Sequence, residues 1–131
     1  ENGLSHVGLS ERGDFSYGSG TKAARALLER HPEMTAIIGS NDQMSLASLD
    51  VVRDRGMHVP RDVSIISFDN TPIVRFSQPP LTAIDQPIAE TVSRAVEKLI
   101  SLRGIPYPGE VIDVEAGLVE RASIGPASSR P

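Results

Sequence analysis

Two short polar clusters, each directly after an apolar run, carry the side chains best suited to chemistry in this sequence. Asn41 and Asp42 follow the run at 35–39, and Asp69 follows the run at 63–68. A carboxylate accepts charge-assisted hydrogen bonds from the hydroxyls of a sugar or polyol, and a side-chain amide both donates and accepts. These clusters therefore favour a binding site for a hydroxylated small molecule. The same residue types are also common in turns and helix caps, which is the alternative interpretation.

Other kinds of site find little support in the residues. Asp42 and Asp69 could form a pair of catalytic carboxylates, but no nucleophile with its base, phosphate-binding loop or metal-binding cluster accompanies them. The three histidines lack the spacing of metal ligands, and cysteine is absent. We therefore expect no enzymatic activity, no metal and no cofactor.

The composition is that of one globular domain, with 39% hydrophobic and 23% charged residues among 131. The net charge is −4, and no block of Lys and Arg is longer than a pair, which disfavours direct contact with DNA. No apolar run approaches the roughly 18 residues that span a bilayer, so we expect no membrane partner. The absence of cysteine suits a cytoplasmic location.

Alternating apolar and amphipathic stretches predict the elements that must position the polar clusters. Short apolar runs predict strands at 6–9, 35–39, 63–68, 81–84, 111–114 and 118–121. Amphipathic stretches predict three helices, one from Ser16 or Ser19 to His31, one from 40–42 to Gly56, and one from Pro87 to Leu102. Residues 72–80 are expected to form a loop. This order predicts an α/β fold, a parallel sheet with flanking helices, in which ligands bind at the carboxyl ends of the strands.

Several motifs occur in a specific order and spacing: GDFS at 13–16, NDQM at 41–44, RGMHVPRDVSIISFDN at 55–70, PLTAIDQP at 80–87 and LVER at 118–121. Together they resemble the LacI/GalR family of bacterial transcription regulators over nearly the whole chain. The resemblance implies a type-1 periplasmic-binding-protein-like domain of two lobes with an effector in the cleft between them. It also implies a helix-turn-helix DNA-binding domain that lies outside this sequence.

The resemblance also divides the chain. Residues 1–86 are expected to form the main part of the carboxy-terminal effector-binding lobe, and 87–116 a helix and a strand that cross to the amino-terminal lobe. Residues 117–131 are expected to return as a strand and a frayed tail. Because the other lobe is not within this sequence, we expect the apolar face of the Pro87 helix to fold back, to be swapped with and covered by a second copy, or to be covered by another association.

Four ligand contacts follow from the resemblance: Phe15, Asn41, Asp69 and Gln86. Phe15 would stack on the apolar face of a sugar or base, unless it is an ordinary core phenylalanine. Asn41 could cap a helix as well as bind ligand, and Gln86 could instead satisfy crossing backbone. Ser67 stands where the family often has glycine, which leaves the shape of the pocket open.

The implied function is the sensing of a small-molecule effector, with a sugar expected, by a homodimeric cytoplasmic regulator. Binding would shift lobe closure and thereby the affinity for operator DNA, which only the helix-turn-helix domain contacts. The alternative is a periplasmic sugar-binding protein of a transport system, which has the same fold. A helix-turn-helix domain or a signal peptide upstream would distinguish the two.

Overall fold

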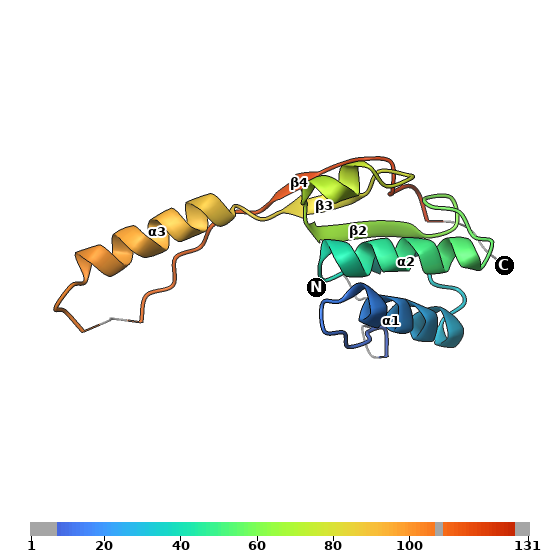
Figure 1. Cartoon of the computed structure of the whole chain (residues 1–131), viewed down its shortest axis with the longest axis horizontal. Helices are drawn as coiled ribbons and strands as arrows, with labels where there is room; N and C mark the ends of the chain where they lie inside the picture. The colour runs from blue at the N-terminus through green and yellow to red at the C-terminus, as the bar shows by residue number, and fades with distance from the viewer. Residues whose placement is uncertain (1–7, 107–108, 128–131) are drawn as a thin grey trace.

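The computed structural model describes residues 8–106 and 109–127. Helices and strands alternate along most of the chain, as the sequence predicts (Figure 1). The elements are α1 (Tyr17–Arg30), β1 (Ala36–Ile38), α2 (Asp42–Asp54), β2 (Ser64–Asp69), the 3-10 helix η1 (Pro72–Arg75), β3 (Thr82–Asp85), α3 (Ile88–Ser101) and β4 (Gly117–Val119). The segment expected to be a loop between β2 and β3 thus contains one short helix.

The four strands form a single sheet in the order β1-β2-β3-β4. β1, β2 and β3 are parallel, with Ile38 opposite Ile66 and Asp69 opposite Asp85. β4 runs antiparallel to β3. The predicted α/β class with a parallel sheet is therefore confirmed, with one antiparallel strand at the edge.

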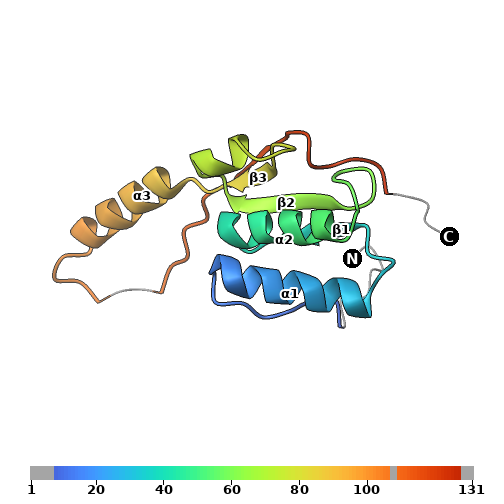
Figure 2. The same cartoon turned by 45° about the vertical axis from the view of Figure 1, so that its right-hand side comes forward.

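The helices α1 and α2 form two layers beneath the sheet. Both views place α2 against β2 and α1 on the far side of α2 (Figures 1 and 2). A helix covered on two sides must be apolar around much of its circumference. Accordingly α2 buries eight of its residues, whereas α1 buries four. The core includes Leu28, Leu49, Val52, Ile65 and Leu81.

One glycine permits the close approach of the two helices. A Cβ atom at Gly20 would lie 2.7 Å from the Cα atom of Met44, which is closer than real Cβ contacts. Gly20 therefore lets the backbone of α1 pack directly on α2. Gly18, two residues earlier in α1, has nothing within 4 Å and carries no such constraint.

Side-chain caps begin both packed helices. The Ser16 hydroxyl accepts a hydrogen bond from the Ser19 backbone nitrogen at 3.1 Å, so Ser16 rather than Ser19 caps α1. Asn41 caps α2 in the same way. Gly56 follows α2 with φ +72°, as predicted for a glycine at a helix C-terminus.

The carboxy-terminal tail stays bonded to the sheet for more residues than expected. Ser123 was predicted to lie in a frayed tail, but it is fully buried. Its hydroxyl donates to the Ile65 carbonyl at 2.5 Å and accepts from the Thr82 nitrogen at 2.7 Å. These bonds fix the tail to β2 and β3, so the prediction was wrong for this residue. Residues 128–131 lie outside the described part of the chain.

The helix α3 extends away from the sheet, and residues 110–114 run alongside it (Figure 1). None of its residues is buried. Its expected folding back onto the rest of the chain was therefore wrong, whereas cover by a second copy stays a prediction. The strand predicted at 111–114 is also wrong, because no strand in the described part of the chain pairs with these residues.

The strand predicted at 6–9 falls partly outside the described residues, since His6 and Val7 are not described. Gly8 and Leu9 form a turn and coil rather than a strand. Among the described helices, none is long and apolar enough to cross a membrane.

Candidate functional site

The four predicted contacts come from four separate segments of the chain. Phe15 precedes α1, Asn41 begins α2, Asp69 ends β2 and Gln86 follows β3. Because β1, β2 and β3 are parallel, their carboxyl ends lie at one edge of the sheet, and Asn41, Asp69 and Gln86 all follow or end these strands. We call this edge the carboxyl edge. It is also the edge from which the chain leaves toward α3.

Phe15 and Asn41 are joined by a hydrogen bond. The Asn41 Nδ2 atom donates to the Phe15 carbonyl at 2.9 Å, and its Oδ1 atom accepts from the Met44 nitrogen at 2.9 Å. Asn41 therefore caps α2 and ties Phe15 to it, while each amide atom can still make one more hydrogen bond. Phe15 is 62% exposed, so it is not an ordinary core phenylalanine.

The turn that presents Phe15 is held by Asp14 and two serines. Phe15 has φ 66°, a backbone conformation that residues other than glycine rarely adopt. Asp14 Oδ1 accepts from the Ser16 nitrogen at 3.0 Å and from the Ser16 hydroxyl at 2.6 Å. Hydrogen bonds from the Ser16 hydroxyl, the Ser19 hydroxyl and the Ser16 backbone lower the pKa of Asp14 to about 2. The carboxylate thus stays charged and keeps the turn in place.

Asp69 and Gln86 also meet. The Gln86 Nε2 atom donates to Asp69 Oδ1, while Asp69 Oδ2 has no hydrogen-bond partner among the described residues. Asp69 has φ 101°, and Asn70 after it has φ 61°. The strand therefore ends in a sharp turn of two strained residues, which aims the Asp69 carboxylate along the carboxyl edge toward Gln86.

A second network supports this turn from the other side. Asn70 Nδ2 donates to Asp85 Oδ1 at 3.0 Å, and Arg121 Nη2 donates to Asn70 Oδ1 at 2.6 Å. Arg121 also donates to the Leu81 carbonyl at 2.5 Å. The turn after β2 is thus bound to the segments that leave and re-join the sheet. Asn70, Asp85 and Arg121 were not predicted as site residues, although all three lie in the motifs that carry the family resemblance.

Asp42 faces away from solvent. It is 4% exposed, and its carboxylate accepts from the Ser67 hydroxyl and from the nitrogen and hydroxyl of Thr71. A carboxylate saturated by internal donors is unavailable to a substrate, so Asp42 and Asp69 do not form a catalytic pair. Ser67, expected to stand where the family often has glycine, is fully buried. Its side chain therefore does not line the surface of the candidate site.

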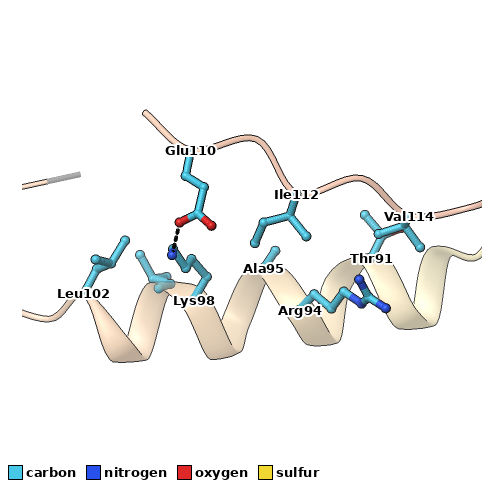
Figure 3. A pocket seen from close by; sticks show the side chains of 9 residues that line it. Thr91, Arg94, Ala95, Lys98, Leu102, Glu110, Ile112 and Val114 are labelled. Carbon is cyan, nitrogen blue, oxygen red and sulfur yellow. Dashed lines mark hydrogen bonds and ion pairs between the residues drawn. The ribbon is translucent and has the colours of Figure 1, made fainter. Parts of the chain in front are cut away.

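A cavity of about 300 Å³ lies elsewhere, between α3 and residues 110–114 (Figure 3). Lys98 and Glu110 form an ion pair across it, and Ala95, Ile112 and Val114 give it an aliphatic lining. None of the four predicted contacts lines this cavity. Across the described residues, no group of three or more His, Cys, Asp or Glu could hold a metal ion.

Residues 1–124 match the family described as the periplasmic binding protein-like domain. The chain belongs to this family. Its relatives include the transcriptional regulator CelR of Thermobifida fusca, 43% identical over 63 residues, which are 48% of this chain and 18% of CelR. Catabolite control protein A of Priestia megaterium is 46% identical over 59 residues, which are 45% of this chain and 18% of that protein.

Solved structures of LacI-family regulators share the fold of this periplasmic-binding-protein-like chain. A regulator from Bifidobacterium animalis subsp. lactis is 36% identical with a TM-score of 0.79, covering 88% of this chain and 42% of that one. A CelR–cellobiose complex is 35% identical with a TM-score of 0.70, covering 85% and 34%. These matches confirm the resemblance to LacI-type regulators, and the chain spans less than half of each of these proteins.

Proposed function

We propose that this chain is part of the effector-sensing domain of a LacI-family transcription regulator and that it binds a sugar or similar small molecule at the carboxyl edge. The observation that carries this proposal is the meeting of Asp69 with Gln86 at the same carboxyl edge to which Asn41, linked to Phe15, belongs. These residues come from four separate segments of a fold whose relatives are regulators. One of the similar structures is a complex with cellobiose.

Each side chain has a chemical role in this proposal. The exposed ring of Phe15 stacks on the apolar face of a sugar ring. Asp69 accepts hydrogen bonds from sugar hydroxyls through Oδ2, and through Oδ1 when Gln86 turns to the ligand. Asn41 uses its remaining amide hydrogen and lone pair. Gln86 lies where the chain leaves the sheet, so it couples the ligand to the outgoing segment.

The proposal includes a second lobe and a regulatory output. Residues 87–116 cross to an amino-terminal lobe, and Leu118 onward returns, which accounts for the exposed apolar face of α3. Effector binding between the lobes favours one closure state of a cytoplasmic homodimer and changes its affinity for operator DNA. DNA contact belongs to a helix-turn-helix domain, and the chain has neither enzymatic activity nor a metal or other cofactor of its own.

Calorimetric titration of the full-length protein with cellobiose and lactose tests the proposal. We expect one of these sugars to bind, and Asp69→Asn to weaken its binding by about tenfold or more, because a charged acceptor is lost. Asp54→Asn, at the far end of α2, is the matched control and leaves affinity unchanged. Equal affinities of the two variants would contradict the site. The alternative, a periplasmic sugar-binding protein, predicts sugar binding with no change in the affinity for operator DNA.

A further inference from the structure

We propose that Asp42 is a positioning residue for this site, because its buried carboxylate fixes the turn that carries Asp69. The inference rests on the proposed function in so far as Asp69 binds the effector. Asp42 itself cannot reach a ligand, since it is 4% exposed and its carboxylate is directed into the protein. It would act on the effector only through the segment that it holds.

The contacts of Asp42 enclose that segment. Its Oδ1 atom accepts from the Ser67 hydroxyl, two residues before Asp69. Its Oδ2 atom accepts from both the nitrogen and the hydroxyl of Thr71, two residues after Asp69, each at 2.6 Å. One carboxylate thus fastens both ends of the five residues from Ser67 to Thr71. The fixed point is the beginning of α2, which is packed between the sheet and α1.

The segment needs such fastening. Asp69 and Asn70 both have positive φ angles, 101° and 61°, and residues in this region persist only where the surrounding structure holds them. Arg121 and Asp85 hold the Asn70 side chain, and the pairing of Asp85 with Asp69 holds the backbone before the turn. The Thr71 nitrogen, bonded to Asp42, is the backbone group that closes the turn.

A carboxylate suits this role better than an amide does. Three donors point at its two oxygens, and hydrogen bonds to a charged acceptor are stronger than those between neutral groups. An asparagine at this position has one acceptor oxygen, and its NH2 group cannot accept from Thr71. Asp42 is also in the first turn of α2, where the helix dipole favours a negative charge. Its neighbour Asn41 caps the same helix. The Phe15–Asn41 pair and the turn that carries Asp69 are therefore both attached to the beginning of α2.

The experiment uses the full-length protein with the substitutions Asp42→Asn, Thr71→Val and Thr71→Ser, together with Asp69→Ala as a reference and Ser48→Ala as a control. Thr71→Val removes one donor and keeps the shape, whereas Thr71→Ser keeps the hydroxyl. Two quantities are measured at a temperature where each variant is folded. They are the dissociation constant for cellobiose and the NMR resonances of the Gln86 side-chain amide in the absence of sugar. The amide resonances report the contact with Asp69 directly.

We expect Asp42→Asn and Thr71→Val to weaken cellobiose binding, Asp42→Asn by about tenfold. Both should shift the Gln86 amide resonances toward those of Asp69→Ala, and Thr71→Ser should restore the native values. Ser48→Ala is the matched control, because it removes a buried hydroxyl of α2 whose one partner among the described residues is the Met44 carbonyl. A purely structural role would lower the free energy of unfolding in all of these variants without moving either quantity in the folded protein.

Unchanged Gln86 resonances in Asp42→Asn would overturn the proposal. If Asp42→Asn does not fold, the contrast between Thr71→Val and Thr71→Ser decides in the same way. If the wild-type protein does not bind cellobiose, the proposed function fails for that sugar alone. The Gln86 resonances then still support the positioning role by shifting, or refute it by staying in place.

Discussion

Leu28 in α1 and Leu99 in α3 are leucines in amphipathic helices of equal length, yet their exposed fractions are 1% and 74%. They belong to two regions. The sheet body comprises residues 8–86 and 117–127, and the outlying segment comprises 87–106 and 109–116. Every residue of the hydrophobic core lies in the sheet body. The outlying segment contains α3, an amphipathic helix none of whose residues is buried.

The difference separates helix formation from burial. The spacing of apolar residues in α3 is enough to predict the helix, because the helical pattern involves only residues three and four positions apart. Burial of the apolar face depends on a partner that is distant in the sequence. In α1 that partner is α2, while the described residues of this chain offer α3 only residues 110–114. The unmatched face is where we propose that the other lobe packs.

The largest expected effect compares the two leucines. Leu28→Ala should lower the free energy of unfolding by about 2–5 kcal/mol, because it leaves a cavity in the core. Leu99→Ala should change it by less than about 0.5 kcal/mol in the 131-residue chain, as for an exposed surface site. Chemical denaturation measures both. In the full-length protein we expect Leu99→Ala to become clearly destabilising, and an effect as small as in the isolated chain would mean that α3 has no partner there.

A smaller effect compares two glycines within α1. Gly20→Ala should destabilise the sheet body by about 1–3 kcal/mol, because its Cβ would overlap the Met44 backbone. Gly18→Ala meets nothing within 4 Å and should be neutral or stabilising by up to about 1 kcal/mol. Thermal and chemical unfolding of the two variants measure the contrast. Similar effects of the two substitutions would contradict the close contact between the Gly20 backbone and Met44.

The smallest effect concerns pH and the start of α1. The folded pKa of Asp14 is lowered to about 2, well below the ordinary value for an aspartate. A lowered folded pKa means that its contribution to stability is present above pH 4 and is lost as the pH falls through about 2. The difference in free energy of unfolding between wild type and Asp14→Asn should therefore shrink between pH 5 and pH 2. This loss should be weaker in a Ser16→Ala background, since the Ser16 hydroxyl is the main cause of the shift. α3 begins with no side-chain cap and offers no matching group.

Local sequence determined most of the helices and strands of the sheet body. Capping serines and asparagines, the glycine after α2 and runs of β-branched residues act through neighbours in the chain, so their effects can be predicted from the sequence. The edge at which the candidate site residues lie could be predicted too. Asn41, Asp69 and Gln86 follow or end parallel strands, and the carboxyl ends of such strands must share an edge.

Tertiary structure decided the partners of those side chains. The contacts of Asp69 with Gln86, of Asn70 with Arg121 and of Asp42 with Thr71 join residues 17 to 51 positions apart, and no local pattern specifies them. The same reason explains the strand wrongly predicted at 111–114, whose β-forming residues have no strand beside them. Residue types along the chain determined which elements form and at which edge the polar groups lie. Long-range packing decided which of those groups turn inward and which remain at the surface of that edge.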